Sequence, residues 1–168
     1  MDLELKRISP DGIPAALEKA ERYRLLNEPA QAESIYRDVL AVDGDHQVAL
    51  RQLILALTDQ LGAHGAAGAA REARELVAQL DDAYDRAYYT GIVFERETRT
   101  YLECTNVVRS AAYEGFRTAM EWYERAQALR PSVAGTDAVL RWNSCVRAIA
   151  RERLGPAEAE AEHEPPLE

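Results

Sequence analysis

The residues that could bind a metal ion or act as nucleophiles are scattered along this sequence rather than grouped. His46, His64 and His163 lie in a turn, in a Gly/Ala stretch and in an acidic tail, and none has the spacing of a zinc motif such as HExxH. Cys104 and Cys145 lack CxxC spacing and lie in helical segments, which is typical of reduced, half-buried thiols. We therefore predict no metal site and no cofactor.

Two further patterns that could support catalysis are also weak. The stretch "GAHGAAGAA" (62–70) has glycines, but it has no Lys, Ser or Thr to hold a phosphate and no preceding strand. Carboxylate pairs such as Asp81 with Asp82 and Glu95 with Glu97 arise by chance in an acidic chain, so we expect solvated charges. Neither a GxSxG elbow nor a Walker loop occurs. The sequence predicts that the protein is not an enzyme.

The composition is that of a folded, helix-rich chain. Hydrophobic residues make up 47% of the 168 residues and charged residues 29%, with only 9 Gly and 7 Pro. Long alternating runs of Val, Ile and Thr are missing, which argues against a sheet. This length suits one domain, and we predict the all-α class.

The charge and the two termini of the chain indicate which partners and which cellular location to expect. The formal net charge is −9, and five glutamates lie in residues 156–168, which contain no Lys or Arg. The mildly acidic remainder would repel polyanions, so we expect no nucleic-acid partner. No run approaches the ~18 apolar residues of a membrane span, and the N-terminus has no apolar signal core. We expect a cytoplasmic protein with no membrane partner and an acidic disordered tail at 155–168, whose final Leu167-Glu168 is typical of a cloning remnant.

A short amphipathic pattern recurs three times along the chain. The segment "AMEWYERAQALRP" (119–131) has small and aromatic residues at helical spacing and ends in proline. Segments 30–46 and 71–82 repeat the spacing of its small and apolar residues. Each copy follows another helix-period segment, and these lie at 14–27, 46–61 and 83–96. Internal repetition of helix pairs predicts a solenoid, in which each pair buries its apolar face on the next.

This pattern resembles the tetratricopeptide repeat (TPR) family, and "AVLRWNSCVRAI" (138–149) is similar to C-terminal segments of uncharacterised bacterial TPR proteins. The residues that match the family's small and aromatic positions are Ala20, Tyr23, Ala32, Tyr36, Val39, Ala73, Val77, Gly91, Phe94, Ala119, Tyr123, Ala126 and Pro131. The resemblance implies a right-handed α-solenoid of about three TPR-like helix hairpins plus a C-terminal capping helix. Its parts would be an N-terminal arm at 1–13 and a helical domain at 14–154, with repeats at 14–45, 46–82 and 83–131 and a capping helix at 136–154.

Two insertions separate this chain from a regular array of 34-residue repeats. Ala32 and Ala73 lie 41 residues apart, and Ala73 and Ala119 lie 46 residues apart. The first excess falls at 62–70, where three glycines oppose a helix, so we predict a loop there.

The second insertion predicts an unusually long helix. We expect this helix to run from Asp82 to Arg109, about 40 Å at 1.5 Å per residue, and to project beyond its neighbours. The pairs Glu95/Arg99 and Arg99/Glu103 have the i,i+4 spacing of ion pairs on a helix surface.

After Pro131 the sequence predicts the capping helix. Thr136 is the expected N-cap, because its hydroxyl can accept a hydrogen bond from the first turn. An apolar stripe at helical spacing would cover the last repeat, and it consists of Val139, Trp142, Val146 and Ile149.

Function follows only from the resemblance. Members of the family mostly bind peptides or helices of other proteins in a concave groove built from the first helix of each pair. The resemblance therefore implies a non-enzymatic scaffold or adaptor with a protein partner. The groove positions, carried over residue by residue, are Leu17, Glu21, Arg24, Arg51, Leu55, Thr58, Tyr88, Ile92 and Glu95.

Three alternatives stay open at this stage. A homo-oligomer could form through the projecting segment 97–112 or through the capping helix. A helical ligand-binding protein or enzyme could use a pocket near the loop 62–70. The two tyrosine-bearing stripes of segment 83–94 could both be core, or one of them could be a binding platform.

Overall fold

The computed structural model describes residues 3–62, 66–103, 107–132 and 135–157, and every regular element in these ranges is helical, which confirms the all-α prediction. The elements are the 3-10 helix η1 (Pro10–Gly12) and the α-helices α1 (Ile13–Leu25), α2 (Pro29–Leu40), α3 (Gln47–Thr58), α4 (Ala66–Val77), α5 (Ala83–Leu102), α6 (Arg109–Leu129) and α7 (Thr136–Glu152). None of these helices is long and apolar enough to cross a bilayer.

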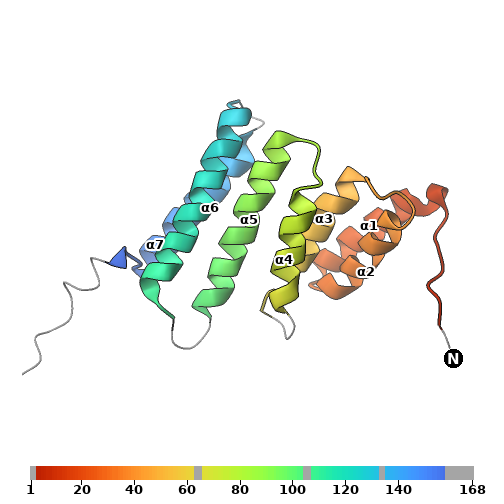
Figure 1. Cartoon of the computed structure of the whole chain (residues 1–168), viewed down its shortest axis with the longest axis horizontal. Coiled ribbons are helices and arrows are strands. Elements are labelled where there is room, and N and C mark those ends of the chain that lie inside the picture. The colour runs from red at the N-terminus through yellow and green to blue at the C-terminus, as the bar shows by residue number, and fades with distance from the viewer. Residues whose placement is uncertain (1–2, 63–65, 104–106, 133–134, 158–168) are drawn as a thin grey trace, which may run out of the picture. The chain divides into compact units, whose positions relative to one another are not determined.

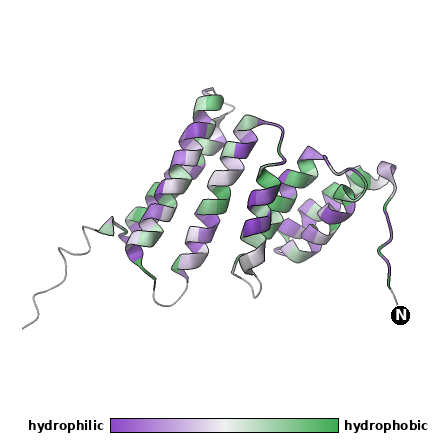
Figure 2. Cartoon of the chain, viewed as in Figure 1, coloured by the Kyte–Doolittle hydropathy of each residue, from purple (hydrophilic) through white to green (hydrophobic). Residues whose placement is uncertain are grey.

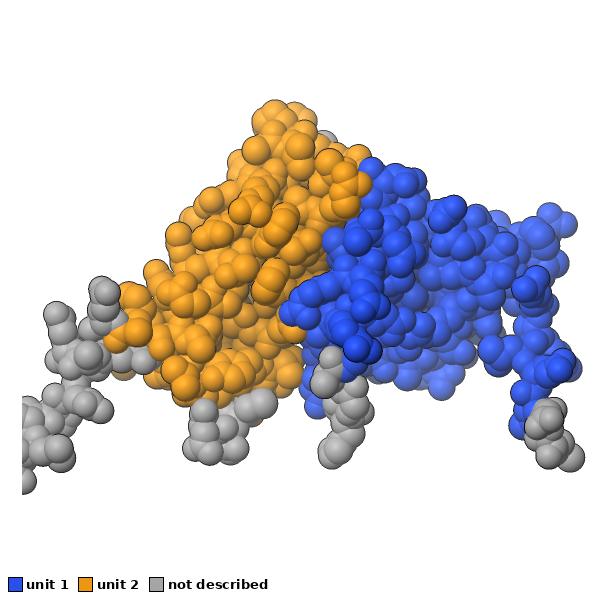
Figure 3. Space-filling model, viewed as in Figure 1, with its two compact units in different colours: residues 1–81 blue, residues 82–168 orange. Residues whose placement is uncertain are grey.

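The chain divides into two compact units, Met1–Asp81 and Asp82–Glu168, which are coloured separately in Figure 3. The sequence predicts a single helical domain at 14–154, and the division falls at the predicted junction between its second and third repeats. Each unit has a core of its own. The right-handed solenoid and the number of repeats stay predictions.

In unit 1, helices that follow one another in the chain pack together. Helix α1 packs on α2, α2 on α3 and α3 on α4, and α1 also touches α3 (Figure 1). Ala20, Ala32 and Ala73 are fully buried, so the helices can approach closely where these side chains meet their neighbours. Figure 2 shows hydrophobic and hydrophilic residues sharing the same helices, as the amphipathic pattern requires.

Local signals set the helix ends in unit 1. Asn27 adopts the left-handed conformation after α1 (φ 60°), and Pro29 opens α2. His46 Nδ1 accepts a hydrogen bond from the Ala49 N–H at 3.2 Å and thereby caps α3. His46 therefore has a structural role as a cap.

The loop predicted at 62–70 is shorter than expected. Helix α4 begins at Ala66, so residues 66–70 are helical, while 63–65 lie outside the described residues. Alanine has the best helix propensity, and a run of alanines outweighs the cost of about 1 kcal/mol that Gly68 introduces.

In unit 2, α5 packs on α6 and α6 on α7. The expected single helix from Asp82 to Arg109 is wrong, because α5 has 20 residues and ends at Leu102 and α6 has 21 residues and begins at Arg109. The extra residues lengthen both helices of the pair. Ala112 and Phe116 are fully buried on the added part of α6, so two packed helices bury apolar surface that one projecting helix would expose.

Helix α7 also differs from its prediction in two respects. Gly135 is the N-cap residue and makes no side-chain bond, and Thr136 is the first helical residue. The fully or nearly fully buried residues are the small ones Ala138, Cys145 and Ala148. The predicted apolar stripe is only partly covered, and its members Val139, Trp142, Val146 and Ile149 are half-buried or exposed. Small side chains thus make the close contact of α7, as they do elsewhere in the fold.

One close approach of α5 to α6 occurs at Gly91. A Cβ atom added there would lie 2.6 Å from Cε1 of Tyr123, a separation that real Cβ atoms do not show. Gly68 on α4 is the opposite case, since no atom lies within 4 Å of the corresponding position. Substitutions at Gly91 and Gly68 therefore separate the packing effect of a methyl group from its effect on helix propensity.

We predict that Gly91→Ala lowers the free energy of unfolding by about 1–3 kcal/mol, because the new methyl group overpacks the contact with Tyr123. The matched control Gly68→Ala should raise it by roughly 0.5–1 kcal/mol, because only helix propensity changes there. Urea denaturation followed by circular dichroism measures both. Equal effects of the two substitutions would contradict the close contact at Gly91.

Candidate functional site

Five of the groove residues predicted in unit 1 reach the surface at least in part. Arg24 on α1 donates from Nε to Asp59 Oδ2 at 2.8 Å and from Nη1 to Gln52 Oε1 at 2.9 Å, which ties α1 to α3. Beside these bonds, Val48, Arg51 and Leu55 follow one another at i, i+3 and i+7 along α3, and all three reach the surface at least in part.

Two further predicted residues belong to α1 on the same side of unit 1. Leu17 is half-buried and Glu21 is exposed. Together these residues form a surface that we call the α1–α3 surface, defined by Leu17, Glu21, Arg24, Val48, Arg51 and Leu55. Thr58 does not join it, because its side chain is buried and its hydroxyl donates to the Ile54 carbonyl at 2.8 Å.

The three groove residues predicted on α5 belong to unit 2, and two of them are wrong. Ile92 and Glu95 are each 1% exposed and therefore cannot meet a partner at the surface. Tyr88 is half-buried. Its ring stacks on Tyr84 with centroids 5.7 Å apart and meets Tyr89 edge-on at 5.4 Å.

The tyrosine stripes of α5 contribute mainly to packing. Tyr84 and Ile92 of one stripe and Val93 of the other are buried, so each stripe has members in the core. Tyr88 also lies 5.9 Å from the ring of Tyr123 on α6. Only Tyr88 and Tyr89 keep part of their rings at the surface.

Glu95 is the centre of a buried polar cluster that sequence reasoning missed. Tyr123 donates its hydroxyl to Glu95 Oε2 at 2.7 Å, and Arg99 Nη2 lies 2.9 Å from Oε1. Arg141 on α7 contributes a second guanidinium at 3.6 Å, and Arg99 also donates to Ser144 Oγ at 2.9 Å. These five residues, the Glu95 cluster, join all three helices of unit 2.

The interpretation of Glu95 and Arg99 as a surface ion pair is therefore wrong. A buried carboxylate is costly unless charged and hydrogen-bonding groups compensate it, and here two guanidiniums and a phenol do so. One signal in the sequence could have indicated this burial. Glu95 continues the stripe of Tyr84, Tyr88 and Ile92 at helical spacing, so it occupies a position where the helix otherwise faces the core.

The groups around Glu95 are poorly suited to nucleophilic or acid–base chemistry. Burial, with a contribution from the Glu95 carboxylate, raises the pKa of the Cys145 thiol to about 12. Burial and the same carboxylate also raise the pKa of Tyr123. A thiol and a phenol that stay protonated at neutral pH are weak nucleophiles and bases, so the cluster acts as a structural link.

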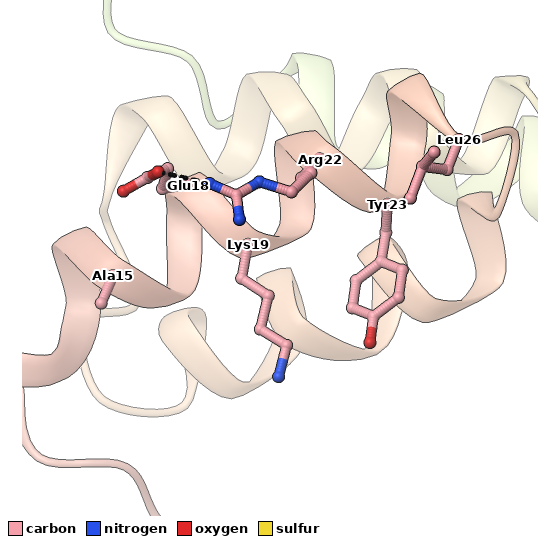
Figure 4. A pocket seen from close by; sticks show the side chains of 6 residues that line it. All are labelled: Ala15, Glu18, Lys19, Arg22, Tyr23 and Leu26. Atoms are coloured by element: carbon pink, nitrogen blue, oxygen red, sulfur yellow. Dashed lines mark hydrogen bonds and ion pairs between the residues drawn. The ribbon is translucent and has the colours of Figure 1, made fainter.

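Open hollows lie on the surface of unit 1. One of about 390 Å³, shown in Figure 4, is lined by the α1 residues Ala15, Glu18, Lys19, Arg22 and Tyr23 and by Leu26, which follows α1. A second of about 560 Å³ reaches Gly62 and therefore adjoins the predicted loop. Two of its polar lining residues are paired, because Asp59 accepts from Arg24 and Gln60 Nε2 donates to Glu33 Oε2 at 2.6 Å.

Candidates for metal binding do not come together in the described parts of the chain. No three His, Cys, Asp or Glu side chains in those ranges gather as a metal site requires. His64, His163 and Cys104 lie outside the described residues. In comparisons with known proteins, the chain matches no protein-family model and no curated protein.

We predict that Glu95→Gln lowers the free energy of unfolding by about 3 kcal/mol, because it leaves Arg99 and Arg141 without their buried counter-charge. Glu121→Gln on the exposed side of α6 is the control and should change stability by less than about 0.5 kcal/mol. Urea denaturation measures both variants. Equal stability of Glu95→Gln and the wild type would show that the Glu95 cluster does not stabilise the fold.

We predict that the Cys145 thiol does not react with Ellman's reagent in the folded protein at pH 8. Its side chain is buried, and its pKa of about 12 leaves less thiolate at that pH than a free thiol has. The measurement uses Cys104→Ser, so that Cys145 is the thiol observed, and the same sample in guanidinium chloride should then release its full signal. Rapid reaction of the folded variant would show that the face of α7 that carries Cys145 is not buried.

Proposed function

We propose that this protein is a non-enzymatic scaffold or adaptor of the TPR type that binds a peptide or helix of another protein. The observation that carries the proposal is the α1–α3 surface, where Arg24 is held in place by Asp59 and Gln52 beside partly exposed apolar side chains. A fixed guanidinium next to apolar anchors suits a protein segment with one acidic residue and apolar neighbours.

The chemistry of this surface supports a peptide rather than a small substrate. Its residues extend along two helices, so a ligand would make contacts spaced by helical turns. Leu17, Leu55 and Val48 supply apolar contacts, and Arg24 and Arg51 supply positive charge. Helix-built surfaces of this kind recognise extended or helical segments through a few anchors.

The alternative function, a ligand-binding protein or enzyme with a pocket near loop 62–70, receives less support. The hollow that reaches Gly62 is open, and its side chains Asp59 and Gln60 are engaged by Arg24 and Glu33. A ligand would have to displace these bonds, whereas binding pockets usually present polar groups that point at the ligand.

The proposal is tested with peptides selected from a random display library on the full chain. We expect selected peptides to bind Leu55→Asp and Arg24→Glu at least about tenfold more weakly, because one variant places charge at an apolar anchor and the other reverses the fixed charge. Leu140→Asp, an exposed leucine on α7, is the control and should bind as the wild type does.

Fluorescence anisotropy measures the affinities, and circular dichroism checks that each variant stays folded. Peptides that bind all four proteins equally would show that the α1–α3 surface is not the binding surface. Failure to select any peptide from several libraries would count against the scaffold proposal itself.

A further inference from the structure

The hollow on α1 has the chemistry of a docking site for an apolar segment. We call it the α1 hollow, and its lining consists of residues from one face of that helix and of Leu26, which directly follows it (Figure 4). Ala15, Tyr23 and Leu26 form its apolar part, and Leu26 remains 64% exposed. Lys19 lies 6.0 Å from the centre of the Tyr23 ring, and its ammonium keeps one edge of the hollow positive.

The rim of the α1 hollow carries both signs of charge. Arg22 Nη2 pairs with Glu18 Oε1 at 2.7 Å, and both side chains are about 70% exposed. An extended occupant would place the apolar side chains of alternate residues into the hollow. A basic residue further along the occupant would meet Glu18.

A segment of this same chain has that pattern. Residues 3–9 precede η1 without helical structure, and Leu3 and Leu5 are 88% and 94% exposed. In an extended chain, residues two apart point to the same side, so the two leucines can enter one hollow together. Glu4 and Lys6 then point to the opposite side, and Arg7 points to the same side as the leucines, where it can meet Glu18.

We propose that the α1 hollow of one copy binds Leu3 and Leu5 of a second copy, so that two copies exchange their N-terminal segments reciprocally. The exchange uses the same two surfaces on each copy and therefore closes as a symmetric dimer. Residues 3–9 span roughly 20 Å when extended, and α1 with its 13 residues is also about 20 Å long. One segment can therefore follow the hollow along most of the helix.

The second copy is the occupant that the exposed leucines favour. Within one chain, Leu3 and Leu5 face solvent while Leu26 stays uncovered, so the contact is not made in a single copy. When two copies pair, the exposed leucines of one copy and the α1 hollow of the other are buried against each other. Arg7 of the segment then lies on the side of Glu18. The inference does not depend on the proposed function, which uses the α1–α3 surface.

The test measures the association of the full chain by sedimentation equilibrium from low to high micromolar concentration. We expect a concentration-dependent dimer whose dissociation constant rises at least about tenfold in Leu3→Asp/Leu5→Asp and in Leu26→Asp. Leu140→Asp is the matched control, since it places the same charge at a 59% exposed leucine on α7 and should dimerise as the wild type does. Circular dichroism confirms that the variants are folded.

A monomer throughout the concentration range would overturn the proposal, and so would a dimer that the arm and hollow variants leave intact. A second measurement locates the contact directly in a Cys104→Ser background. Leu5→Cys on one copy and Ala15→Cys on another should form an intermolecular disulfide in a mixture, whereas Leu5→Cys with Ala150→Cys should not. A Leu5→Cys/Ala15→Cys double variant that closes within a single chain at high dilution would show that the segment occupies its own hollow instead.

Discussion

Tyr123 links the packing of unit 2 to its electrostatics. Its ring lies so close to the Gly91 backbone that a methyl group at residue 91 would come within 2.6 Å of it. The same approach brings its hydroxyl to 2.7 Å from Glu95. An uncompensated carboxylate in the interior would be very costly, so Glu95 depends on the short distance between α5 and α6 that Gly91 permits. The glycine and the buried charge, which lie one helical turn apart on α5, therefore act as one feature.

The two units distribute their charges differently, and this affects what each can do. In unit 1, Arg37 pairs with Glu33 and Glu72 at the surface, and its hydrogen bond lowers the pKa of Glu72. Exposed pairs of this kind contribute little to stability, so the apolar core of unit 1 holds its helices together. In unit 2, by contrast, the ion pair between Glu95 on α5 and Arg141 on α7 links two helices. Surface charges in unit 1 can therefore take part in recognition without weakening the fold.

The sequence predicted the features that depend on periodicity and on side-chain size. Helical class follows from the 3.6-residue pattern, and five of the small residues that match the family positions are buried, namely Ala20, Ala32, Ala73, Gly91 and Ala119. It failed where a tertiary contact decides the outcome. The continuous helix expected after Asp82 relied on i,i+4 charge pairs, which contribute less than the burial of Ala112 and Phe116 where α6 packs as a separate helix. The groove positions Ile92 and Glu95 came from family resemblance, which cannot detect that Tyr123 and Arg99 enclose the carboxylate.

The distribution of polar groups also bears on the choice between binding and catalysis. A catalytic group must reach a substrate and exchange a proton or form a bond near neutral pH. The Cys145 thiol is buried with a pKa of about 12, and Asp59 is engaged by Arg24. The polar groups held most firmly in the described parts of the chain are therefore committed to other side chains. Arg24 is likewise held by Asp59 and Gln52, and its side chain is only 19% exposed. Under the proposed function, a bound protein segment would contact this fixed guanidinium at its edge together with the partly exposed Val48 and Leu55 on α3.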